Sequence, residues 1–165
     1  MKGMEKYEFI GEYSAGCKKR NKKFAFGVMS ASSNKNNQYV TPKWVFDKGA
    51  TSYTYNNGYV DQIIPNWKDN IFLENMNKLV EEMGKRYDGN ENIAYIDIRS
   101  YGNWGEQHLG TINGDEILPE ELKELYIEPY IQNFKKTLLV NPWGNDSYAD
   151  TYKWAIDNGL TIRRD

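Results

Sequence analysis

Short apolar runs alternate with amphipathic stretches along most of this chain, and this alternation limits its possible folds more than any other feature. Expected strands cover residues 23–30, 93–100, 137–141 and 160–163, each bounded by polar turns. Apolar residues recur at helical spacing over 3–20, over 70–86, from about 119, and from about 145 to 158. Helix followed by strand, repeated along the chain, predicts an α/β fold with a parallel sheet and crossover helices.

Several residues mark the ends of these helices. Pro119 suits a first helical turn, and Pro129 is expected to divide the helical region that follows it. The last helix has Asn145, Asp146 or Ser147 as candidate caps and is expected to stop at residues 158–159, Asn-Gly. Residues 31–69 are rich in Asn, Ser, Tyr, Gly and Pro and predict no long regular element, so we expect a functional loop or an insertion there.

The order of elements alone allows either a barrel or an open doubly wound sheet. A phosphate-binding glycine loop would favour the open sheet, but no Gly-rich turn here joins a strand directly to a helix with the required spacing. The 165 residues make one domain, 1–165, and fall below the roughly 250 residues of a complete eight-fold barrel. A chain of this length could hold only part of such a barrel, and from these features alone a barrel and an open sheet both remain possible.

Composition excludes several classes of function. The net charge is −2 with dispersed cations, so neither nucleic acid nor an anionic membrane is an expected partner, and the basic run at 18–20 is interpreted as a solvated helix end. One cysteine, Cys17, excludes an intrachain disulfide, and a single histidine excludes a multi-histidine metal site. No cofactor is implied. We expect a soluble chain whose compartment is not determined by the sequence.

The candidate chemistry lies just beyond the clearest strand, in Arg99-Ser-Tyr-Gly-Asn-Trp-Gly-Glu-Gln-His108. In α/β architectures, functional residues collect past the carboxyl ends of strands. The glycines permit a tight loop in which Trp104 could stack on a sugar, Arg99 and Asn103 could bind hydroxyls, and Glu106 could act as general acid. Alternatively, Glu106 pairs with Arg99 or caps a turn, and His108 is an exposed bystander. The remaining candidates for substrate binding are Tyr101, His108, Asn141 and Trp143.

The run from Tyr87-Asp-Gly-Asn90 through residues 96–108, which includes this segment, resembles the barrel core of β-galactosidase-like glycoside hydrolases of clan A, bacterial relatives included. Weaker matches are Lys22-Lys-Phe-Ala-Phe-Gly-Val-Met29, Thr41-Pro-Lys-Trp-Val-Phe46 and Gly159-Leu-Thr-Ile-Arg-Arg-Asp165. The resemblance implies a fold of the α/β class in which this chain is a partial (β/α) TIM-type barrel, incomplete at both ends. It also implies action on carbohydrate, with Glu106 as general acid/base. That family usually has a tryptophan after the glutamate, whereas this chain has Gln107, so part of the sugar platform is expected to differ.

A retaining enzyme of this kind needs a second carboxylate on a late strand, about 5 Å from the first. We expect that strand to lie beyond this chain, which is then a fragment with the acid/base half of a site and is inactive alone. Asp97 and Asp165 are the internal substitutes, although Asp97 near Arg99 is expected to form an ion pair. Unpaired strand edges predict self-association or completion by another chain.

Two other interpretations remain open. One is a non-catalytic carbohydrate-binding α/β module that uses tryptophans as stacking surfaces, namely Trp44, Trp67, Trp104 and Trp143. The other is an α/β domain in which the Trp-Gly-Glu turn has an architectural role only.

Overall fold

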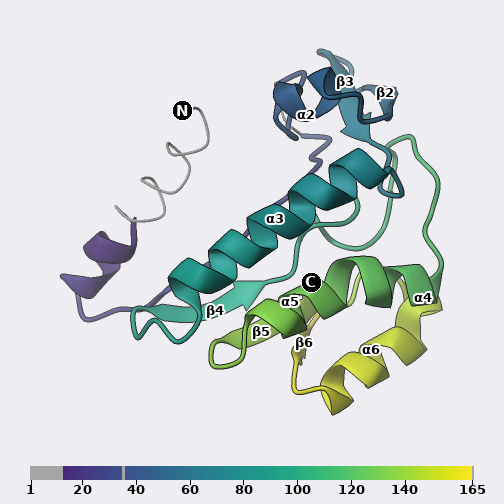
Figure 1. Ribbon diagram of the computed structural model, residues 1–165. Coiled ribbons are helices and arrows are strands. Elements are labelled where there is room, and N and C mark those ends of the chain that lie inside the picture. Colours follow the sequence, from purple (N-terminus) through teal and green to yellow (C-terminus); the bar gives the residue numbers. More distant parts are fainter. Residues whose placement is uncertain (1–12, 35, 165) are drawn as a thin grey trace.

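The computed structural model describes residues 13–34 and 36–164, and its centre is a four-stranded parallel sheet (Figure 1). Its strands are β1 (Phe24–Gly27), β4 (Ile93–Asp97), β5 (Leu138–Pro142) and β6 (Thr161–Arg163). They lie in the order β1-β4-β5-β6, so each strand pairs with the next sheet strand along the chain. The prediction of a mixed α/β fold with parallel strands is therefore confirmed.

The connections between these strands are helical. β1 leads to β4 through α3 (Asn70–Tyr87), and β4 leads to β5 through α4 (Pro119–Leu122), the π-helix η1 (Lys123–Ile127) and α5 (Glu128–Asn133). β5 leads to β6 through the 3₁₀-helix η2 (Asp146–Tyr148) and α6 (Ala149–Asp157). Parallel crossovers are nearly always right-handed, so a sequential strand order places all of these helices on one face of the sheet. In agreement, α3 packs against α5, and α4 packs against α6.

The predicted helix ends are confirmed. α3 begins at Asn70, as predicted. Asp69, which was not among the predicted caps, accepts hydrogen bonds there from the backbone amides of Ile71 and Phe72, both at 2.9 Å. Pro129 lies in the first turn of α5, where η1 gives way to regular helix. Asn145 caps η2, and α6 ends just before Gly159, which has a φ of +87°. The expected N-terminal helix is seen over residues 13–18; residues 1–12 lie outside the described part of the chain.

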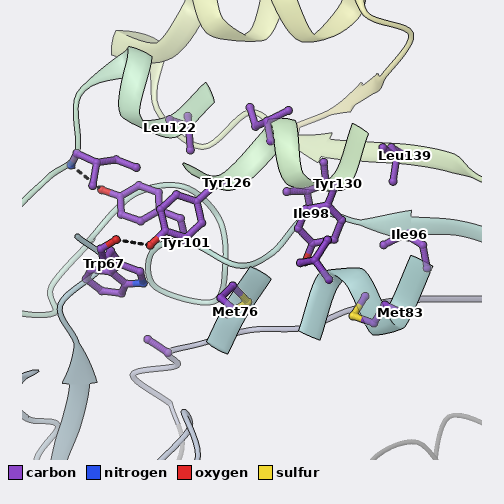
Figure 2. Packing of buried hydrophobic residues seen from close by; sticks show 14 of the residues in the cluster. Trp67, Met76, Met83, Ile96, Ile98, Tyr101, Leu122, Tyr126, Tyr130 and Leu139 are labelled. Atoms are coloured by element: carbon purple, nitrogen blue, oxygen red, sulfur yellow. Dashed lines mark hydrogen bonds between the residues drawn. The ribbon is translucent and has the colours of Figure 1, made fainter. Parts of the chain in front are cut away.

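The hydrophobic core lies between the sheet and its helices (Figure 2). Ile96 and Ile98 on β4 and just beyond it are at most 1% exposed, and Met83 of α3 is equally buried. Much of the aromatic content is in this core rather than on a surface. The most deeply buried tyrosines among the described residues are Tyr101, Tyr126, Tyr130, Tyr148 and Tyr152.

These tyrosines keep hydrogen-bond partners for their hydroxyl groups. Tyr126 donates to the carbonyl of Trp67 at 2.6 Å, and Tyr148 donates to the carbonyl of Ile117 at 2.9 Å. Burial raises the pKa of Tyr130 to about 12, because the phenolate would lose hydration that the interior does not replace. The core is therefore apolar in packing but contains oriented hydroxyls.

Residues 31–69 contain three short elements that the sequence pattern did not predict. They are α2 (Lys43–Asp47) and an antiparallel hairpin of β2 (Ser52–Asn56) and β3 (Asp61–Pro65). β2 was missed because its inward side chains are tyrosines and its outward side chains are polar, so it lacks an aliphatic strand signature. Asn57 closes the hairpin by accepting from the amides of Tyr59 and Val60, both at 3.0 Å. The hairpin is thus an insertion between β1 and α3.

The opposite face of the main sheet, called the open face below, carries no crossover helix in the described part of the chain. Alternation along the strands puts Asp97 and Val140 on it, because Ile96 and Leu139 face the helices. Arg163 of β6 reaches the same face, where it contacts Asp97. None of the described helices is long and apolar enough to cross a membrane.

Candidate functional site

The segment 99–108 follows β4 directly and folds into a tight turn at the carboxyl end of the sheet. Four of its residues have positive φ, namely Gly102, Trp104, Gly105 and Gln107. A Cβ on Gly105 would overlap the carbonyl of Arg99, so only glycine fits there. Backbone hydrogen bonds close the turn, among them those from the Asn103 amide to the His108 carbonyl at 2.8 Å and from the Glu106 amide to the Asn103 carbonyl at 3.0 Å.

This turn brings four of the predicted site residues together. Arg99 Nη2 lies 3.3 Å from Glu106 Oε1, and His108 Nε2 lies 3.5 Å from Glu106 Oε2. Trp104 meets the His108 ring edge-on, with 6.1 Å between centroids. The side chains of Arg99, Glu106 and His108 are 21%, 22% and 27% exposed, so a ligand could reach each of them. The ion pair between Glu106 and Arg99, foreseen as an alternative to catalysis, is present.

Asp97 lies below this turn on the open face. Its Oδ2 contacts Arg99 Nε at 3.1 Å and Arg163 Nε at 3.0 Å, and its side chain is 14% exposed. The predicted ion pair between Asp97 and Arg99 is confirmed. Arg163, Asp97, Arg99 and Glu106 thus form a row of alternating charge with no net charge, called the charge row below. Asp165, the other substitute carboxylate, lies outside the described residues.

Arg163 was missed as a site residue. The sequence feature that could have identified it is its position at the carboxyl end of an expected strand, one residue after Ile162, which packs against the core. Alternation therefore sends the Arg163 side chain to the open face. Its pairing with Asp97 could not be predicted, because that contact spans β5 and depends on the strand order.

Three predicted substrate-binding residues are interior. Tyr101 is 1% exposed, and its hydroxyl accepts from the Ile117 amide at 3.3 Å. Asn103 is fully buried and bonds Ser33 through both ends of its amide, at 2.9 and 3.0 Å. Asn141 is also fully buried and pairs with Gln107. These side chains do not face solvent as they lie, so we assign them to the frame of the site rather than to ligand contact.

The tryptophans proposed as stacking surfaces have different environments. Trp67 is 1% exposed and donates to Ser30 Oγ at 3.1 Å, so the prediction that it offers a stacking surface is wrong. Trp143 lies just after β5. Its ring packs against the Tyr152 ring at a tilt of 47°, with 4.9 Å between centroids, and its indole N–H donates to Asp146 at 2.6 Å. Trp44 is 42% exposed, with Lys48 Nζ 4.6 Å from its ring centroid.

The arrangement therefore offers a carboxylate, an imidazole, a guanidinium and an indole at one strand end. These groups can exchange a proton, orient a hydroxyl and cover an apolar sugar face. Within the described residues, no group of three or more His, Cys, Asp or Glu side chains is placed to hold a metal ion. Comparison of the chain with protein-family models, curated proteins and solved structures finds no match.

Proposed function

We propose that this chain forms part of a (β/α) barrel of the glycoside-hydrolase kind and carries the acid/base half of its site, with Glu106 as the general acid. The sequential order of four parallel strands supports a barrel wall. A doubly wound sheet would reverse its strand order at a switch point, where its ligand binds. These four strands include no such reversal.

The position of Glu106 carries the proposal. It is a partly buried carboxylate at the carboxyl end of β4, with a cation on one oxygen and an imidazole beside the other. Protonated Glu106 would donate to the glycosidic oxygen as the bond to the sugar breaks. Trp104 would cover the apolar face of the sugar, and Arg99 and His108 would bind hydroxyl groups or hold Glu106 in place.

The proposal assigns the second carboxylate to a strand or a chain that completes the barrel. Asp97 is a poor substitute because two guanidinium groups already bind its Oδ2. Two buried atoms, Asp97 Oδ1 and Trp104 Nε1, have no hydrogen-bond partner among the described residues. Since buried polar atoms are normally paired, they support a site that further chain or a bound carbohydrate completes.

The experiment is hydrolysis of phenyl glycosides, with sodium azide added as a substitute nucleophile. Phenol is a poor leaving group, so its departure depends on the general acid. We expect azide-dependent phenol release that Glu106→Gln lowers by about 10²-fold or more, the usual contribution of a general acid. Glu91→Gln is the matched control, because that side chain is 83% exposed and lies at the amino end of β4. Equal rates for wild type and Glu106→Gln, or no release with any glycoside, would contradict the proposal.

A non-catalytic carbohydrate-binding module is the second candidate, and the exposure of Trp44 favours it. In that case, a sugar should quench tryptophan fluorescence, and Trp44→Ala should abolish the quenching. If the sugar binds at the Glu106 site instead, Trp104→Ala rather than Trp44→Ala should abolish the fluorescence quenching. Quenching that survives both substitutions would contradict both assignments.

A further inference from the structure

We propose that Gln107 and Asn141 are positioning residues that set the location of the Glu106 carboxylate. Their side-chain amides pair reciprocally: Gln107 Nε2 donates to Asn141 Oδ1 at 2.7 Å, and Asn141 Nδ2 donates to Gln107 Oε1 at 3.2 Å. The pair links the turn after β4 to β5. Both side chains therefore point into the protein.

The pair lies in the interior, where its geometry has most effect. Gln107 is 1% exposed and Asn141 is fully buried. In such surroundings, a broken amide pair would leave several polar groups unsatisfied, so alternative placements of the turn are costly. Apolar side chains of similar volume could fill the same space but would not fix the direction in which the turn leaves β4.

Gln107 also has a backbone conformation that needs support. Its φ is +60°, a left-handed value that non-glycine residues seldom adopt, and its amide donates to the Tyr101 carbonyl at 3.1 Å. Glu106 immediately precedes it, so the direction of the Glu106 side chain depends on this conformation. Asn141 holds Gln107 in that conformation through the side chain.

The end of β5 holds Glu106 from a second direction. A Cβ on Gly144 would overlap the Glu106 carbonyl oxygen, so the two backbones are in close contact that only glycine allows. Asn141 and Gly144 therefore fix adjacent residues of the turn from one strand end. Glu106 is located by β5 as much as by β4, the strand that it follows.

His108 gives a direct measurement of where the Glu106 carboxylate lies. It is the single histidine of the chain, so its ring C–H signals in a proton NMR spectrum can be assigned without comparison with other histidines. Its Nε2 lies 3.5 Å from Glu106 Oε2, so the positions of these signals depend on where the carboxylate lies. Glu106→Gln gives the position of these signals without the carboxylate. In Gln107→Leu/Asn141→Leu, which removes both amides together, we expect the signals to move at least halfway from the wild-type position toward that of Glu106→Gln.

Rescue separates positioning from simple packing. The exchanged pair, Gln107→Asn/Asn141→Gln, keeps one amide at each position and should return the His108 signals toward the wild-type position. Asn77→Asp, an exposed change on α3, is the control and should leave them unmoved. If the leucine pair does not fold, Asn141→Asp replaces it, because that change turns the 3.2 Å hydrogen bond into a contact of two oxygens. His108 signals that stay at the wild-type position in a folded variant would overturn the proposal.

The kinetic consequence rests on the proposed function of Glu106, whereas the NMR measurement does not. In the azide-assisted reaction, the leucine pair should lower kcat by about tenfold or more with KM unchanged, because a misplaced acid affects the transition state more than binding. A lower Tm with unchanged kcat would show a packing role only and would contradict the kinetic part. If Glu106→Gln leaves hydrolysis unaltered, the proposed function fails while the NMR shift still decides the positioning role.

Discussion

Replacing Asp97 with asparagine tests whether the charge row stabilises the fold. The substitution keeps the size of the side chain and removes its charge. Arg99 and Arg163 then face each other's positive charge without the carboxylate between them. We expect Asp97→Asn to lower the free energy of unfolding substantially at neutral pH.

The expected magnitude follows from burial. Breaking a fully buried ion pair from one side costs about 3–5 kcal/mol, whereas exposed pairs contribute about 0.2–1 kcal/mol. Asp97, Arg99 and Arg163 are 14%, 21% and 24% exposed, which is nearer the buried limit but leaves some access for water. A loss of about 2–3 kcal/mol is therefore expected. At about 2–4 °C per kcal/mol for a chain of this size, Tm should fall by about 4–12 °C.

The assay is urea and thermal unfolding followed by circular dichroism, with Asp150→Asn as the control. Asp150 makes a 2.9 Å ion pair with Lys153, but these side chains are 94% and 70% exposed, so the same change of charge should cost less than about 1 kcal/mol. Arg163→Met, alone and combined with Asp97→Asn, completes a double-mutant cycle. Equal losses for Asp97→Asn and Asp150→Asn, or strict additivity in the cycle, would refute the reasoning.

Two pH effects are also expected. Burial alone would raise the pKa of Asp69, but hydrogen bonds from Thr51, Phe72 and Ile71 outweigh burial and lower that pKa. The pKa of Asp88 is lowered in the same way, by hydrogen bonds from the amides of residues 136 and 137. The stabilisation that these two carboxylates contribute is present above the ordinary pKa of 3.8 and is lost as pH falls through the lowered pKa values. Acid unfolding should therefore begin at higher pH in Asp69→Ala than in the wild type. This variant also loses the cap of α3, which costs about 1 kcal/mol. An unchanged acid midpoint would argue against this. Because burial raises the pKa of Tyr130 from 10.0 to about 12, its stabilisation is complete below pH 10.0 and is lost as pH rises toward 12. Tyr130→Phe should reduce the alkaline loss of stability in pH-dependent urea titrations, and an identical profile would contradict the assignment.

Periodicity predicted the regular part of the fold because it records burial against one layer of helices. The stripe over residues 70–86 corresponds to α3, and the apolar runs correspond to the four parallel strands. Prolines and capping residues predicted the helix ends because their effects are local. β2 escaped prediction because its inward side chains are tyrosines and the others are polar. β3 escaped it because its two aliphatic residues, Ile63 and Ile64, are adjacent and so do not alternate.

The candidate site was predictable only in part, for a related reason. The segment after β4 could be recognised because Arg99, Trp104, Glu106 and His108 are close in sequence. Whether a polar residue of that segment faces solvent depends on neighbours distant in sequence. Asn103 is buried against Ser33, a residue of the β1 connection, and that pairing leaves no local sequence pattern.

The charge row links the turn that carries Glu106 to β6, the last described strand of the sheet. Arg99 is shared between two carboxylates, with Nε toward Asp97 and Nη2 toward Glu106. Arg163 supplies Asp97 with a second cation and so reduces the pull of Asp97 on Arg99. Removing Arg163 would favour a tighter contact between Arg99 and Asp97 and a longer one between Arg99 and Glu106, because a carboxylate left with one cation attracts it more strongly. The environment of Glu106 therefore depends on Arg163 of β6 as well as on β4.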